Sequence, residues 1–127
     1  MNLQETFDTV YIHLLTQNEK SMAPFPFPNT VEVGALTCSY RGKNGTKCAV
    51  GCLIKDEFYN SSFEGKFSYA PVVSDALENS GVDMSVQGMH TMLLDLQEVH
   101  DNSSIGLWKG ALANVAFKYN LTIPNMP

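Results

Sequence analysis

The stretch YRGKNGTKCAVGC (residues 40–52) decides how the middle of this chain folds. It holds the only arginine of the protein, two lysines, three glycines and two cysteines. The tetrapeptide GKNG (42–45) is a turn signal, and short runs with β character flank it at 36–40 and 47–54. We therefore predict a β-hairpin whose strands are these two runs. The second run is also compatible with a short buried helix, because so short an apolar run does not distinguish the two structures.

Helical periodicity dominates most of the remaining chain. Apolar side chains such as Phe7, Val10 and Leu14 recur with the i, i+3, i+4, i+7 spacing of a buried helix face. Pro71 suits a first helical turn, and Gly81 suits the position after a helix end. Such signals predict four helices, at 3–17, 71–79, 87–100 and 104–119. The fold class that follows is α+β, with a single small domain at 1–127 in which about four helices pack around the short β-hairpin.

The segment that follows the first helix is rich in proline. Pro24, Pro26 and Pro28 alternate with Phe25 and Phe27, and this pattern excludes a helix and favours an extended, polyproline-like path. Two roles stay open for the loop at 23–33: it is held down by one phenylalanine, or it binds a partner.

The composition narrows the possible function classes of the protein and its cellular compartment. The net charge of −5 argues against general nucleic-acid binding, which needs a basic surface. No apolar run approaches the ~18 residues of a membrane span, and the N-terminal segment lacks the basic and apolar regions of a signal peptide. We expect a cytoplasmic protein without membrane contact. Three cysteines in a reducing compartment predict free thiols and no disulfide framework.

The glycine-rich turn does not form a nucleotide-binding P-loop. Gly42 and Gly45 are too close together for that motif, and Lys47 is followed by a cysteine. A looser site for a small anionic ligand remains open, built from backbone N–H groups with Arg41, Lys43 and Lys47. The alternative is an exposed hairpin tip, with the arginine paired to an acidic residue of the same chain.

The cysteines allow two further interpretations. Cys38, Cys48 and Cys52, with His13 or His100 as fourth ligand, form an alternative Cys3His zinc site, although the sequence contains no second zinc knuckle. A cysteine-dependent enzyme needs a nearby base, which His13 or His100 with its neighbour Asp101 supplies. Buried cysteines often pack as small apolar side chains, so we predict no cofactor and keep zinc as the alternative.

Several blocks of the sequence resemble one family of small proteins. The blocks are HLLTQNEKS (13–21), CSYRGKNGTKCAVGCLI (38–54), FEGK (63–66), LLDLQEVHD (93–101) and LWKGALANVAFKYNL (107–121). In this order they resemble proteins found in tailed bacteriophages and in bacterial genomes, with the pattern HLLTQ…YRG…CAVGCLI…LQxxHD…W. The resemblance covers most of the chain, and its central block is the most specific part.

The resemblance implies a context without a mechanism. It implies a phage-type accessory protein in the cytoplasm of a bacterial host. In that setting, we expect a small acidic protein without a catalytic signature to act by binding a host protein or by sequestering a host nucleotide signal as a counter-defence. The sequence carries no signal for an oligomeric state. If the first helix packs on the hairpin, polar residues of the shared blocks line a ligand cleft or form a network that fixes helix to hairpin. The candidate ligand-binding residues are Arg41, Tyr40, His13, Gln17, Lys43, Lys47, Gln97 and His100.

Overall fold

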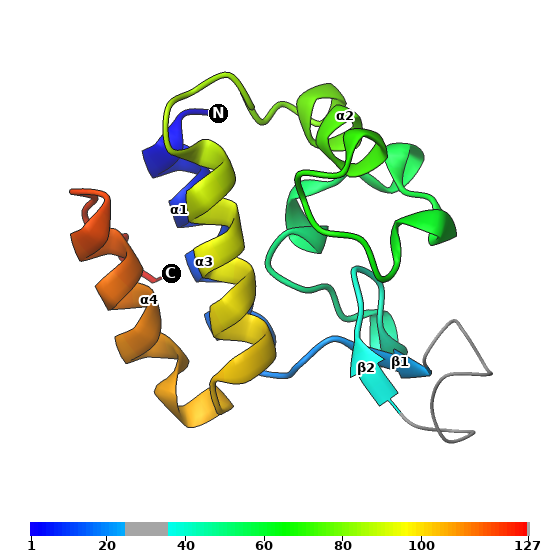
Figure 1. The fold of residues 1–127 in the computed structure, drawn as a ribbon. Coiled ribbons are helices and arrows are strands. Elements are labelled where there is room, and N and C mark those ends of the chain that lie inside the picture. Colours follow the sequence, from blue (N-terminus) through cyan, green and yellow to red (C-terminus); the bar gives the residue numbers. More distant parts are fainter. Residues whose placement is uncertain (25–35, 127) are drawn as a thin grey trace.

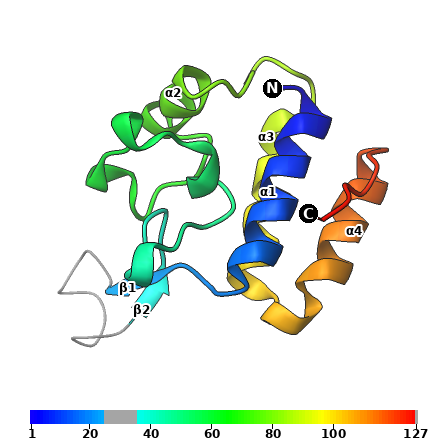
Figure 2. The ribbon, with the colours of Figure 1, turned by 180° about the vertical axis from the view of Figure 1, so that it is seen from behind.

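The structure is a computed structural model that describes residues 1–24 and 36–126. Its described part contains four α-helices and a two-stranded antiparallel sheet, which confirms the predicted α+β class. In Figures 1 and 2, α1, α3 and α4 lie side by side on one side of the molecule, and the sheet, the 3-10 turns between residues 43 and 63, and α2 lie on the other. The helices are α1 (Leu3–Gln17), α2 (Pro71–Asn79), α3 (Met89–Asn102) and α4 (Trp108–Lys118).

Helix α1 has the bounds that the sequence predicts, because both of its ends are capped locally. Asn2 and Glu5 form a reciprocal capping box at the start of the helix. At the other end, Asn18 adopts a left-handed conformation (φ 50°) and its N–H bonds the Leu14 carbonyl oxygen.

No helix in the described ranges has the length and apolar character needed to cross a bilayer.

The remaining helices match their predictions to within a few residues. Helix α2 begins at Pro71 and is followed by Gly81 (φ 106°), as its signals indicate. Helix α3 begins two residues later than predicted, because Gly88 (φ 88°) still has a left-handed backbone. The last predicted helix, 104–119, divides into the 3-10 turn η5 (Ile105–Leu107) and α4.

The predicted pairing of 36–40 with 47–54 is wrong. Strand β2 (Leu36–Cys38) instead pairs with β1 (Met22–Pro24), in the register Met22 opposite Cys38. Ser21 and Ser39 extend this contact, because the Ser39 N–H donates to the Ser21 carbonyl oxygen and the Ser21 hydroxyl donates to the Ser39 carbonyl oxygen. The extended start of the proline-rich segment therefore takes the place next to β2. The predicted loop at 23–33 lies largely outside the described residues.

The turn at GKNG forms as predicted, but a single bridge replaces the hairpin around it. Arg41 and Lys47 form an isolated antiparallel bridge on either side of the 3-10 turn η1 (Lys43–Gly45). Beyond this bridge the chain enters a second 3-10 turn, η2 (Gly51–Leu53). The run 48–54 thus forms turns instead of a strand, and its N–H groups bond carbonyl groups of the same run, which satisfies the backbone of this largely buried segment.

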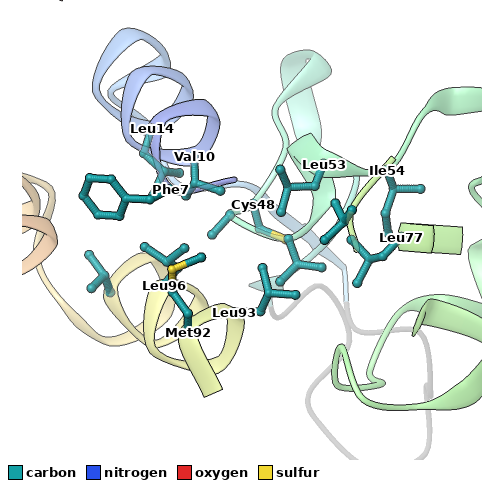
Figure 3. Packing of buried hydrophobic residues seen from close by; sticks show 14 of the residues in the cluster. Phe7, Val10, Leu14, Cys48, Leu53, Ile54, Leu77, Met92, Leu93 and Leu96 are labelled. Carbon is teal, nitrogen blue, oxygen red and sulfur yellow. The ribbon is translucent and has the colours of Figure 1, made fainter. Parts of the chain in front are cut away.

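The hydrophobic core joins the helical layer to this turn. Figure 3 shows Phe7, Val10 and Leu14 of α1 beside the apolar face of α3, with Leu53 and Ile54 on the way to α2. The α3 residues in this contact are Met92, Leu93 and Leu96, all fully buried. Cys48 lies at the centre of the same contact, so the segment after the glycine turn serves as core.

Candidate functional site

Arg41 is the first predicted anion-binding residue, and its guanidinium is held by acceptors of its own chain. Nη1 donates to the Gly51 carbonyl oxygen at 2.8 Å, and Nη2 donates to the Ile54 carbonyl oxygen at 2.8 Å. The same group lies 3.1 Å from the Asp56 carboxylate and 4.7 Å from the centre of the Tyr59 ring. These contacts satisfy the carbonyl groups around η2, so Arg41 clamps the turn onto the strand end.

The lysines of the turn occupy different surroundings. Lys43 is exposed at the tip. The Lys47 ammonium lies 3.4 Å from the Asp56 carboxylate, which Arg41 also contacts. Lys47 first, and then Arg41, hold the pKa of Asp56 below its usual value. The exposed carboxylate of Asp56 therefore already occupies the place that an external anion takes in the predicted site.

His13 and Gln17 connect α1 to the backbone of Lys47. The Gln17 side-chain amide donates to the Lys47 carbonyl oxygen at 3.0 Å and accepts from the Lys47 N–H at 2.9 Å. His13 Nε2 is 2.8 Å from the same carbonyl oxygen. Burial lowers the pKa of His13, and the nearby Lys47 charge adds to this. Both predicted residues thus fix the helix to the glycine turn.

Glu64 organises the strand end and is a residue that the candidate set lacks. Its carboxylate accepts the backbone N–H groups of Tyr40 at 2.8 Å and Arg41 at 3.2 Å. It also accepts the Tyr59 hydroxyl at 2.6 Å. Tyr40 in turn donates its hydroxyl to the Lys66 carbonyl oxygen. The FEGK block (63–66) is the sequence signal for this residue, because it places one carboxylate next to a glycine turn.

Gln97 and His100 connect α3 to two other segments. Gln97 Oε1 accepts the Val50 N–H at 3.0 Å, and its Nε2 donates to Asp101 Oδ1 at 2.8 Å. His100 is fully buried, and its Nε2 accepts the Ser21 N–H at 2.9 Å. A backbone N–H only donates, so the ring hydrogen of the histidine lies on Nδ1, which donates to Asp101 Oδ1 at 2.8 Å.

The predicted residues therefore form two groups and not a single cleft. One group surrounds the glycine turn and consists of His13, Gln17, Arg41, Lys43 and Lys47. The other group lies along α3 and the end of β2 and consists of Tyr40, Gln97 and His100. Nearly all of these side chains hold backbone groups of distant segments in place, as the network alternative describes.

A cavity of about 290 Å³ lies beside the second group. Its walls are the strand end at 38–40, the loop at 64–68 and one face of α3. The α3 residues are Leu94, Gln97, Glu98 and Asp101, whose spacing of three, four and seven residues places them on the same helix face. Tyr40 and Gln97 belong to both the predicted set and this cavity. The helical spacing was the available signal for Glu98 and Asp101, but sequence alone does not place the loop at 64–68 opposite them.

The three cysteines are free, and their surroundings favour the neutral thiol. Burial and the Asp101 charge raise the pKa of Cys38 to about 11. Burial raises the pKa of Cys52 to about 12 and that of Cys48 further. A thiol nucleophile needs the opposite shift, so these cysteines offer little thiolate at neutral pH.

The predicted zinc ligands are not gathered in one place. Among the described residues, the ligand atoms of Cys38, His100 and Asp101 lie within 4.8 Å of one another, whereas Cys48 and Cys52 are not part of this group. A metal-binding histidine usually donates its second N–H to an acceptor. Nε2 of His100 faces the N–H donor of Ser21. If Nδ1 bound a metal, the ring hydrogen would lie on Nε2, where it would meet this donor instead of an acceptor. The tautomer of His100 fits a hydrogen-bonded structural role better than a metal ligand.

Comparison with protein-family models, with curated proteins and with solved structures found no match for this chain.

Proposed function

We propose that this protein acts by binding a partner, and that the cavity between the loop at 64–68 and α3 is its binding site. The observation that carries the proposal is the cavity itself, which is framed by groups held in place on three different segments. The chemistry around it supports binding over catalysis. The thiol of Cys38 has a raised pKa, and both nitrogens of His100 are already engaged.

In the context that the sequence resemblance implies, the protein is a phage-type accessory protein in the cytoplasm of a bacterial host. Of the two partner classes, a host protein is favoured over a nucleotide signal. The carboxylates of Glu64, Glu98 and Asp101 line the cavity, and they repel the phosphates of a nucleotide. The volume of about 290 Å³ is also at the lower limit for ligand pockets, which suits one side chain and not a dinucleotide.

A cavity-filling variant tests this proposal. Leu94→Trp places a larger side chain on the cavity wall, and Val72→Trp is its control, because Val72 is 47% exposed on α2 and does not line the cavity. Each protein is immobilised and exposed to bacterial lysate after circular dichroism has established that it folds. We expect a specific host protein on the wild type and on Val72→Trp, and a large loss on Leu94→Trp.

Nucleotides and cyclic oligonucleotides are screened in parallel by thermal shift. A ligand at a hundredfold excess over its Kd adds about 2.7 kcal/mol of apparent stability. A nucleotide that produces such a shift would redirect the proposal to signal sequestration. Capture that Leu94→Trp leaves unchanged would show that the cavity is not the binding site, and turnover of a bound molecule would favour an enzyme.

A further inference from the structure

The last turn of α3 presents unusual charge to the cavity. Glu98 and Asp101 both line it, with Asp101 in the final turn of the helix and Glu98 directly before that turn. A helix C-terminus already carries partial negative charge, so carboxylates at this position add to an unfavourable field. Glu64 adds a third carboxylate from the opposite wall. A cation in the cavity relieves this repulsion.

The protein does not neutralise these carboxylates with its own lysines or arginine. In residues 1–24 and 36–126, every ion pair made by a lysine or arginine is formed with Asp56 or Asp95. Lys66 lines the cavity, but its ammonium donates to the Ser62 carbonyl oxygen at 2.6 Å. Lys20 donates at 3.3 Å to the backbone carbonyl oxygen of Asp101, and the side chain of that residue contacts His100 instead.

Hydrogen-bond acceptors remain available on one side of the cavity. The hydrogen bonds from His100 and Gln97 both end on Oδ1 of Asp101, and the Cys38 thiol also bonds this carboxylate. Burial opposes ionisation of Asp101, but these two hydrogen bonds outweigh it and hold its pKa below the usual value. Within the described part of the chain, the exposed Glu98 takes part in none of the ion pairs.

A buried hydroxyl adds an independent indication of a missing partner. Ser68 lines the cavity, is 3% exposed, and its Oγ has no hydrogen-bond partner. Buried hydroxyls are rarely left unsatisfied, because the loss of water must be compensated by another hydrogen bond. Among the described residues, Ser68 thus keeps one enclosed polar atom unsatisfied next to the cavity.

Part of the remaining lining is apolar and includes the ring of Phe67. Val50 and Leu94 form apolar wall, and Phe67 lines the cavity although it is 60% exposed. Its ring stacks on Tyr69 with centres 5.3 Å apart and an interplanar angle of 11°. Aromatic rings next to carboxylates are suited to an ammonium or guanidinium group, which gains cation–π attraction and ion pairing together.

Resting on the proposed binding function, we infer that the cavity recognises an alkylammonium or guanidinium group on a short apolar stem. The charged end pairs with Asp101 and Glu98, and the stem lies against Val50, Leu94 and the Phe67 ring. This chemistry is present in the lysine and arginine side chains of a protein partner and in free small amines. The two sources are distinguished by experiment.

The direct test follows the backbone amides of the intact protein by NMR during titration with n-butylammonium. We expect amide shifts that saturate at 38–40, 64–68 and 94–101, and an affinity that falls as salt is added. The neutral analogue 1-butanol should bind at least fivefold more weakly, and butyrate should produce no shifts there. Equal binding of 1-butanol, or an absence of shifts at these residues, would overturn the inference.

Matched carboxamide variants identify the charge that matters. Glu98→Gln should lower the affinity for n-butylammonium about three- to tenfold, which corresponds to the loss of one exposed ion pair or slightly more. Glu57→Gln removes an equally exposed carboxylate that does not line the cavity, and it should leave the affinity unchanged. If both variants lost the same affinity for n-butylammonium, the assignment would be wrong, because the loss would then come from the overall charge of the protein.

The source of the cation is decided by competition. A lysine-containing peptide that displaces n-butylammonium supports a protein partner, whereas displacement by spermidine alone supports a free amine. Failure of n-butylammonium to bind, with host-protein capture still lost in Leu94→Trp, would refute the ligand class and leave the binding function standing. Amine binding without capture of any host protein would support the ligand class and remove the protein partner.

Discussion

Arg41 donates a hydrogen bond from its guanidinium to the carbonyl oxygen of Ile54 at 2.8 Å, across thirteen residues of sequence. This hydrogen bond gives Arg41 a structural role, because its planar guanidinium group bonds the far end of η2, the turn that follows the glycine turn. A second bond from the same group to the Gly51 carbonyl oxygen holds the near end. The two hydrogen bonds therefore link the glycine turn to the buried segment behind it.

The first prediction concerns this clamp. Arg41→Lys keeps the charge but cannot donate to two carbonyl groups in the same plane, so the free energy of unfolding should fall by about 1–3 kcal/mol. Lys43→Ala, at the exposed tip of the same turn, should change it by less than about 0.5 kcal/mol. Urea denaturation measures both. An unchanged free energy of unfolding in Arg41→Lys would contradict the structural role and would favour a role of Arg41 in ligand binding.

The second prediction concerns the close approach of two backbones. A Cβ at Gly51 would overlap the carbonyl oxygen of Tyr40. Gly51→Ala should therefore destabilise the protein by about 1–3 kcal/mol through overpacking. Gly110 offers a matched control, because a Cβ there meets no atom within 4 Å and the residue lies inside α4. Gly110→Ala should stabilise the protein by about 0.5–1 kcal/mol, and thermal melts would reveal the opposite signs.

The third prediction concerns acid. The folded pKa of His13 lies below its unfolded value of 6.5, so the unfolded chain binds the proton more readily. The stability that neutral His13 contributes is therefore fully present above about pH 6.5 and is lost as pH falls through the folded pKa. His13→Gln keeps a donor for the Lys47 carbonyl oxygen without titrating. The stability advantage of the wild type over this variant should shrink between pH 7.5 and pH 5; a constant difference would contradict the shift.

The fourth prediction concerns metal. Because His100 Nε2 accepts a backbone N–H, the group formed by Cys38, His100 and Asp101 should not retain zinc. Elemental analysis of protein purified without chelator should find less than one zinc ion per ten chains. Stoichiometric zinc that disappears in Cys38→Ser would refute this and would restore the metal alternative.

Local signals account for the parts of the fold that were predictable. The capping box at Asn2 and the left-handed Asn18 determine α1, and Pro71 with Gly81 determines α2, because all four act within a few residues of the helix ends. The tight turn at GKNG follows from the same kind of signal. The segment after it contributes to the core, since Ala49, Val50 and Leu53 are buried, whereas Cys52 is partly exposed.

The strand partner and the cavity depended on contacts that no local pattern encodes. Two segments with extended character could pair with residues 36–38, namely the run at 47–54 and the start of the proline-rich segment. Strand β2 pairs with Met22–Pro24, and the hydrogen bonds between Ser21 and Ser39 continue this pairing. The cavity needs the strand end, the loop at 64–68 and α3 to meet.

By itself the sequence determined where the helices begin and end, where the chain turns and which side chains are apolar enough to be buried. These properties depend on neighbours three or four residues away, so a local sequence pattern carries them. Only the tertiary structure decided that Arg41 faces its own carbonyl groups and that Glu64, Glu98 and Asp101 surround one cavity. Those outcomes depend on which distant segments come together, and close packing of the whole core selects that arrangement.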